Sequence, residues 1–416
     1  PASANSIAIK LTSRAVGNSI TISGVTVSNN EVSGFVDRAV NIAAWANASN
    51  SATFENVNIS NNTSDGAINV EALAEGASSS ATAKTININS NSIVSQDRAV
   101  NINARAADAS SNATVENVSI DGNTITGNLT GIDVYKQGSG TTKLQNFTIT
   151  GNNLTINNPK EDGCAVSLAN VSGNSSLSKN TVTVTGAIGG SGSYFDGGDI
   201  SGSATGSWNI TGNTLDGNNV GTASSGIRLR NSLPVAATFT MTGNSVTEWA
   251  QGISSEAMAI GTKVELRRNW IFDNHSYGIS NAISGATIDA ILNYWGDKSG
   301  PYHLTTNSSG LGNSVSDNVD FDPWHQDEDF KSLSDGTVHN MTQDKYYHSI
   351  QTAINEANPG DTIQVMQGIY YESVTINKSV TLTGDCGDEN IPGPGPNAPI
   401  LDGTGQGDHK YGFYID

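Results

Sequence analysis

The stretch Ile120-Asp121-Gly122-Asn123-Thr124-Ile125 decides the fold, because the chain repeats its pattern from end to end. An apolar residue, two polar or small residues, an asparagine and a second apolar residue recur at intervals of 24 to 33 residues. Self-similarity at this period predicts a solenoid, in which each copy is one turn that buries its core against its neighbours. The aligned asparagines are Asn30, Asn62, Asn91, Asn123, Asn152, Asn180, Asn213, Asn244, Asn269 and Asn293.

Each period also holds a second strand-like phrase, which follows a glycine or an arginine, as in Gly131-Ile-Asp-Val. Short strands separated by polar turns, with no helical period, exclude a βαβ fold and predict an all-β parallel β-helix, a β-solenoid. Its rungs would lie ~4.8 Å apart, with Ile, Val and Leu inside. Asparagine suits one corner because it tolerates left-handed backbone angles and its amide can bond to the copy above. We expect this asparagine ladder to be purely structural.

The composition bounds the possible partners. Net charge is −19 and charged residues make up only 14% of the chain. An acidic chain disfavours nucleic acid and anionic membrane surfaces, and favours a salty or extracellular setting. There is no run of 18 apolar residues to span a bilayer. Two cysteines, Cys164 and Cys386, are too few for a disulfide scaffold, and Cys164 is expected in the core.

Three segments resemble a known family, the right-handed parallel β-helix proteins of the pectin-lyase-like superfamily, especially repeat-bearing surface proteins of archaea and bacteria. The first is the asparagine repeat over 20–297. The second, Asn293-Tyr-Trp-Gly-Asp-Lys-Ser-Gly-Pro301 with the phrase that ends at Trp324, resembles the closing of such helices. The third, from Ser349 to Gly384, resembles their beginning, with a capping helix near 348–357 followed by the first rungs.

The order of these segments is unusual, because the beginning of a β-helix follows its closing motif. We divide the chain into rungs and closing motif (1–324), a linker (325–345), and the beginning of a following β-helix or of a neighbouring subunit (346–416). Joining Asp416 to Pro1, which is no initiator Met, restores the family's order, so the chain is expected to be a piece of something longer.

This order has three explanations. The chain is one period of a tandem array, or a subunit whose C-terminal part covers the open end of the next subunit, or a fragment of two β-helices. The first two give an assembly that does not close on itself. We therefore expect the chain's partner to be another copy of itself, joined head to tail through residues 346–416 and the N-terminal rungs.

Catalytic motifs are sparse. The superfamily contains polysaccharide lyases and hydrolases, whose chemistry needs paired carboxylates or an acidic calcium cluster beside a base. No triplet of the hydrolase kind occurs, so we expect no enzyme. Asp196 and Asp199 lie in a Gly-rich stretch and are weak candidates for a cation such as calcium, although a solvated loop is the simpler interpretation. No other cofactor or metal is expected.

Arginines on the late rungs could form a basic strip, but at net −19 ion pairs with Glu248, Glu256 and Glu265 are the better explanation. The arginines are Arg228, Arg230, Arg267 and Arg268.

Sixteen sequons for N-glycosylation occur, against about ten expected by chance from the composition. The better candidates are those expected in loops, namely Asn47, Asn112, Asn307 and Asn340. The six tryptophans fall in different rung positions, which weakens the case for a sugar-binding groove.

The sequence thus favours an extracellular structural protein, the repeating subunit of a head-to-tail filament, sheath or surface layer. A polysaccharide lyase or hydrolase, and a carbohydrate-binding or adhesive surface module that contacts cell-surface glycans, are the alternatives.

Overall fold

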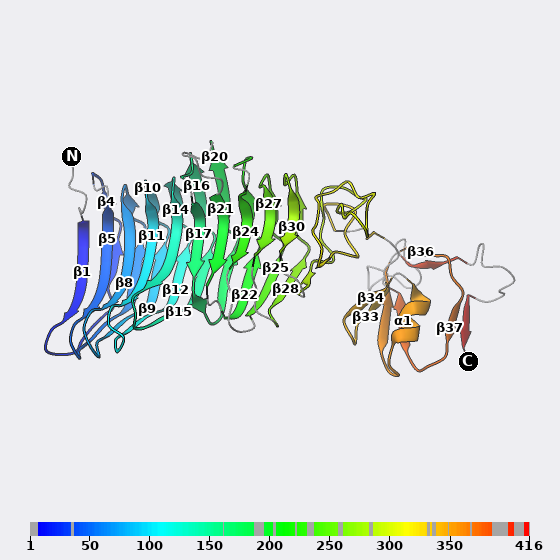
Figure 1. Ribbon diagram of the computed structural model, residues 1–416, viewed down its shortest axis with the longest axis horizontal. Coiled ribbons are helices and arrows are strands. Elements are labelled where there is room, and N and C mark those ends of the chain that lie inside the picture. The colour runs from blue at the N-terminus through cyan, green and yellow to red at the C-terminus, as the bar shows by residue number, and fades with distance from the viewer. Residues whose placement is uncertain are drawn as a thin grey trace.

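The structure, a computed structural model, is an all-β parallel solenoid followed by a smaller unit that contains its one described helix (Figure 1). It describes residues 7–34, 37–160, 162–186, 195–202, 205–220, 223–230, 237–256, 261–282, 286–330, 333–334, 338–347, 349–366, 368–384, 398–402 and 412–415. The predicted fold class and the short helix near 348–357 are confirmed, the helix being α1 (Ile350–Glu356).

Each turn of the main solenoid, residues 7–334, crosses three parallel sheets in the order A, B, C. Sheet A contains β1 (Ile7–Ala15), β5 (Arg38–Ala46), β8 (Ala67–Ala74), β11 (Arg98–Ala106), β14 (Thr130–Gln137), β17 (Gly163–Ala169), β21 (Phe195–Ser201), β24 (Ser225–Arg230), β27 (Gln251–Ser255) and β30 (Tyr277–Asn281). Sheet C contains β4 (Glu31–Val32), β7 (Thr63–Ser64), β10 (Ser92–Ser95), β13 (Thr124–Gly127), β16 (Asn153–Asn157), β20 (Thr181–Thr185), β23 (Thr214–Asp216), β26 (Ser245–Thr247) and β29 (Trp270–Phe272).

Sheet B lies between them in chain order and holds the longest strands. It contains β2 (Ile20–Ser23), β3 (Thr26–Ser28), β6 (Ser51–Ser60), β9 (Ser80–Asn89), β12 (Asn112–Asp121), β15 (Thr141–Thr150), β18 (Val171–Ser172), β19 (Ser175–Ser178), β22 (Gly206–Thr211), β25 (Ala237–Thr242), β28 (Lys263–Arg267), β31 (Ile288–Asp289) and β32 (Val319–Asp320).

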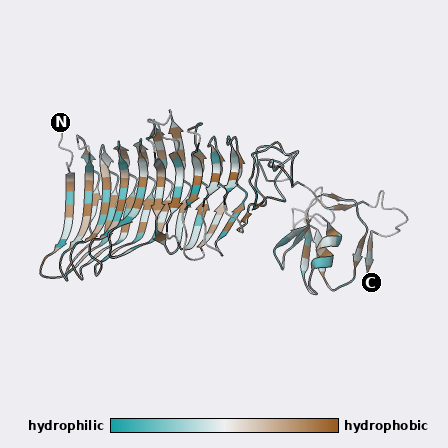
Figure 2. Cartoon of the chain, viewed as in Figure 1, coloured by the Kyte–Doolittle hydropathy of each residue, from teal (hydrophilic) through white to brown (hydrophobic). Residues whose placement is uncertain are grey.

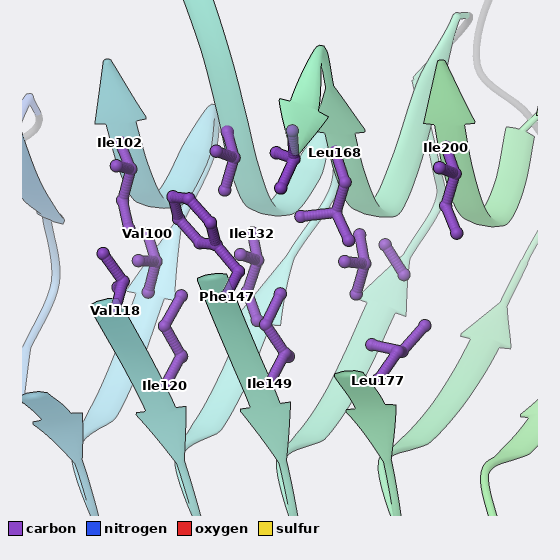
Figure 3. Close-up of a cluster of buried hydrophobic side chains, with 14 of the residues drawn as sticks. Val100, Ile102, Val118, Ile120, Ile132, Phe147, Ile149, Leu168, Leu177 and Ile200 are labelled. Atoms are coloured by element: carbon purple, nitrogen blue, oxygen red, sulfur yellow. The ribbon is translucent and has the colours of Figure 1, made fainter. Parts of the chain in front are cut away.

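The core is built of stacked columns, because parallel pairing places equivalent residues of successive rungs over one another. Val100 of β11 is in register with Ile132 of β14, and Ile120 of β12 with Ile149 of β15. Side chains from sheets A and B meet between the sheets (Figure 3), and apolar bands cross the strands from rung to rung (Figure 2). All four of these residues are fully buried. The period-two alternation in the sequence therefore becomes one continuous core.

The last rungs are covered by a closing segment, residues 286–334. β31 pairs with β32, and isolated bridges join Ile279 to Val315 and Tyr294 to His325. Trp295 is fully buried in the core, and Trp270 donates from Nε1 to the carbonyl of Glu328 at 2.9 Å. The rungs at this end are thus shielded from solvent, as a terminal rung requires.

The C-terminal unit, residues 338–415, has its own small core. Its elements are β33 (Val338–Asn340), β34 (Lys345–Tyr347), α1, β35 (Thr362–Val365), β36 (Ile369–Tyr370), β37 (Val374–Ile376), β38 (Thr381–Gly384), β39 (Ile400–Leu401) and β40 (Phe413–Ile415). Parallel pairs β35–β38, β36–β39 and β37–β40 make two rungs of a second three-sided solenoid.

The expected linker at 325–345 needs correction at both ends. His325 and Leu333 form a bridge within the closing segment, and Val338–Asn340 is strand β33, which pairs with β34 and β35. Backbone pairing therefore extends into both ends of the range 325–345. The division of the chain into domains otherwise stays a prediction.

Candidate functional site

The asparagine repeat forms one corner of the solenoid, where each sheet B strand turns into sheet C. The Oδ1 of Asn123 accepts from both the backbone N–H and the Nδ2 of Asn91, each at 2.9 Å. Its own Nδ2 donates to Asn152 Oδ1 and to the carbonyl of Ile88. The same pattern runs through all ten asparagines from Asn30 to Asn293, with Nδ2 to Oδ1 distances of 2.8 to 3.0 Å. Nine of the ten are buried, and the amides of these nine both donate and accept hydrogen bonds within the corner, which indicates a structural role for this row.

The left-handed backbone angle expected at the ladder asparagine belongs instead to the residue before it. Asn61, Lys179 and Arg268 have φ of 53°, 54° and 53°, and Gly122 and Gly243 have 61° and 66°. The ladder asparagine stays in ordinary backbone geometry because its amide must point along the solenoid axis. Glycine or asparagine occupies the left-handed position in only some rungs, so the sequence pattern located the corner one residue late.

The ladder has a direction and therefore two different ends. From Asn30 to Asn269 each Nδ2 donates to the Oδ1 of the ladder asparagine in the following rung, so from Asn62 to Asn293 each Oδ1 accepts from the preceding rung. No described residue donates to Oδ1 of Asn30, which is half-buried. A further rung placed before β1 would find this acceptor ready, while Asn293 lies under the closing segment.

The N-terminal rung is open at its outer edge. Within the described residues, β1 pairs only with β5, β2 only with β6, and β4 only with β7. Ile9 and Ile22 are only partly buried, whereas their partners one rung inward, Val40 and Phe54, are each 1% exposed. Strand edges and apolar side chains are thus both uncovered here.

The C-terminal unit has the opposite polarity, covered at its beginning and open at its end. α1 and β33 cover its first rung, where Ile363 is 0% and Val374 1% exposed. In the second rung Phe413, in register with Val374, is 46% exposed, and Ile415 is 78% exposed. The sequence pattern alone does not identify this exposure. β1 and β40 lie at opposite ends of the molecule (Figure 1).

Asp196 and Asp199 do not lie in a solvated loop, as the glycines around them suggested, but in β21 of sheet A, where both are buried. Asp199 binds Arg230, with Oδ2 to Nη2 at 2.6 Å, and Asp196 lies 3.4 Å from Nη1 of Arg228. Burial raises the pKa of Asp196 to about 7, against the opposing effect of Arg228. Since each carboxylate faces a guanidinium, the pair is poorly suited to a cation.

The expected ion pairs of the late arginines are partly different from those seen. Arg228 does approach Glu256, at 3.4 Å, but Glu248 accepts from Asn219 and Glu265 lies 3.9 Å from Lys263. The other acidic partners are aspartates one rung away, including Asp289, which binds Arg267. The sequence analysis expected glutamate partners, but the cross-rung register determines which charged side chains lie close enough to pair. Among the described residues no three His, Cys, Asp or Glu side chains gather as a metal site.

The four glycosylation candidates differ in access. Asn47 is half-buried in the turn between β5 and β6, and Asn112 is exposed but opens β12 rather than lying in a loop. Asn307 donates from Nδ2 to the carbonyls of Ser299 and Pro301. The loop expected at Asn340 is wrong, because this residue lies in β33, is 0% exposed and donates to Asp361 Oδ2 at 2.8 Å. A folded unit leaves no room for a glycan on Asn340.

Two further features of the described residues bear on function. Cys164 is buried at 7% exposure, as expected, while Cys386 lies outside the described residues. Trp208, Trp249 and Trp295 are fully buried in the core, so they form no external sugar-binding surface. No helix in the described part of the chain is long and apolar enough to cross a membrane.

Comparison with known proteins gives no match: no protein-family model fits the chain, and no curated protein or solved structure is significantly similar to it. Function must therefore be argued from the geometry alone.

Proposed function

We propose that this chain is an extracellular structural protein, the repeating subunit of a head-to-tail filament, sheath or surface layer. One observation carries the proposal. The described residues form two pieces of three-sided parallel solenoid, each covered at one end and open at the other. The main solenoid is open at its first rung, and the C-terminal unit is open at its last rung, so one open end could stack on the other. Among the described residues, no strand pairs with the outer edges of β1, β2 and β4 or with the outer edges of β38, β39 and β40.

The physical argument starts from uncovered strands. An open parallel rung leaves backbone N–H and C=O groups unpaired and apolar side chains in water, which favours pairing with another chain. Phe413 and Ile415 together with Ile9 and Leu11 are such side chains. A contact between two different surfaces of the same chain repeats without closing and so builds a fibre or a lattice.

The mechanism of such a protein is mechanical. Force along the axis is carried by backbone hydrogen bonds between rungs and by the asparagine ladder, whose side-chain hydrogen bonds also run along the axis. A resemblance to the surface proteins of archaea and bacteria, and a surface rich in Ser, Thr and Asn with few charges, support an extracellular place.

Sedimentation velocity and negative-stain electron microscopy of the purified chain test the proposal. We expect concentration-dependent linear polymers, and we expect Phe413→Asp with Ile415→Asp to give monomers. Leu311→Asp is the matched control, because Leu311 is 79% exposed but lies on the closing segment. Monomers of the unchanged chain at all concentrations, especially with activity on a polysaccharide, would contradict the proposal.

A further inference from the structure

We propose that β38, β39 and β40 of one copy pair with β1, β2 and β4 of a second copy, all parallel, so that sheets A, B and C continue through the junction. This inference rests on the proposed function and specifies its joint. The second copy is a separate chain or the next repeat of a tandem array, since the contact is the same in both.

The first argument is the match of inward rows. Leu382 of β38 is in register with buried Ile363, and Ile9 of β1 is in register with buried Val40, so both point inward. Placing Leu382 over Ile9 sets Thr381 over Ala8 and Thr383 over Lys10.

The other two sides of the rung give the same result. Ile415 of β40 is in register with the inward-facing Ile376, and Val32 of β4 is in register with buried Ser64. Both side chains therefore point toward the core. Leu401 of β39 likewise continues the row of Tyr370. A one-residue slip would turn these rows outward.

The second argument fixes the rotation of one rung on the other. A three-sided rung can be placed on another in three settings. In the main solenoid the chain always steps from a sheet C strand to the sheet A strand of the next rung, as from β7 to β8. When β40 stacks on β4, the last residue of β40 lies beside the first residue of β1, as in the step from β7 to β8. The other two settings do not bring these two strand ends together.

The third argument is charge. Residues 1–34, which include β1, β2 and β4, contain Lys10, Arg14 and Glu31, a net charge of +1 in a chain of −19. Residues 381–416 contain one lysine against six Asp or Glu, which gives −5. Opposite net charge of the two terminal segments of sequence steers them together and disfavours contact between two like segments.

Disulfide trapping between full-length chains tests the setting. One chain carries Thr383→Cys or Tyr414→Cys, the other carries a cysteine on the N-terminal rung, and both carry Cys164→Ala and Cys386→Ala. Adjacent strands lie ~4.8 Å apart, within the ~4.4–6.8 Å between Cα atoms that a disulfide spans. We expect cross-linked dimers for Thr383→Cys with Lys10→Cys, and for Tyr414→Cys with Glu31→Cys.

The matched controls exchange the partners, pairing Tyr414→Cys with Lys10→Cys and Thr383→Cys with Glu31→Cys. These pairs sit on different sides of the rung in the proposed setting and should not cross-link. Polymers in which only the exchanged pairs react, or no pair reacts, would overturn the strand map and leave the structural function standing. Absence of any self-association under all conditions would overturn both.

Discussion

At the scale of single residues, each corner of the ladder needs a side chain that hydrogen-bonds along the axis and a residue that bends the backbone. The ladder asparagine has the first role and the residue before it has the second, whereas the sequence pattern suggested that the asparagine had both. The asparagine satisfies four buried polar groups with one amide, and the preceding residue bends the backbone. The first task demands one residue type, so its period was visible in the sequence. The second is met by glycine, asparagine, serine, lysine, arginine and even Leu292, so no pattern marked it.

Removing one ladder amide should be costly. Asn123→Ala would remove the partner that the backbone N–H of Asn91 and the carbonyl of Ile88 have in this buried corner, and one of the two acceptors of Asn91 Nδ2. Since each unsatisfied buried group costs roughly 1–3 kcal/mol, we expect a loss of about 3 kcal/mol or more. Chemical denaturation measures it. Asn153→Ala is the control, because the side chain of Asn153 is exposed on β16, and an equal effect of the two variants would contradict the ladder's role.

The left-handed position predicts opposite effects in neighbouring rungs. Arg268→Gly should stabilise the fold by about 0.5–1 kcal/mol because it relieves a non-glycine residue at φ 53°. Gly243→Ala should destabilise it by about 1 kcal/mol, although an added Cβ meets only the backbone N of Gly212 at 3.9 Å. Thermal unfolding of the two variants measures both effects. Changes of the same sign would show that the backbone angle is not the cause.

Asp196 makes the fold sensitive to pH. Its pKa, raised to about 7 by burial, stands above the ~3.9 of an unfolded chain, so the folded state binds the proton more tightly. The fold is therefore progressively destabilised by this group as pH rises from about 4 to about 7. Asp196→Asn should flatten the dependence of the unfolding midpoint on pH in that window. The control is Asp121→Asn, at an exposed site. If Asp196→Asn leaves the slope of the unfolding midpoint against pH unchanged, Asp196 does not cause the pH dependence in this window.

At the scale of elements, the sequence predicts well whatever depends on repeating side chains and poorly what depends on a single contact. The strand alternation and the asparagine period predict the solenoid, and the resemblance of residues 349–384 to the beginning of known β-helices predicts α1. The positions of Asp196, Asp199 and Asn340 were misjudged because glycine and sequon neighbours suggest loops. The partners of these buried residues are Arg228, Arg230 and Asp361, which lie 21 to 32 residues away in the sequence. The cross-rung register brings in the two arginines, and the antiparallel pairing of β33 with β35 brings in Asp361.

Helix α1 depends on one carboxylate from the first rung of its unit. Glu372 accepts from the backbone N–H groups of Ile350 and Gln351, at 2.8 and 3.0 Å, and from the hydroxyl of Ser349. Glu372→Ala should remove these bonds and loosen the helix by about 2 kcal/mol. Hydrogen exchange of the α1 amides should accelerate accordingly. Glu356→Ala, at an exposed carboxylate of the same helix, is the control, and equal exchange in the two variants would contradict the anchor.

At the scale of the whole molecule, the two open rungs explain why the beginning of a β-helix follows its closing motif. A solenoid has no natural length, so its ends must be covered by a cap or by another rung. Here the closing segment covers one end of the main solenoid, and α1 with β33 covers one end of the C-terminal unit. The order of segments was readable from the sequence, whereas the exposure of Phe413 and Ile415 needed the structure.

Fibre diffraction from aligned assemblies tests the central claim most directly. If open rungs join head to tail, the solenoid axis is the fibre axis, and the ~4.8 Å spacing between rungs must appear along the fibre direction. A 4.8 Å spacing perpendicular to the fibre direction would mean that the solenoids associate side by side, and it would contradict the account.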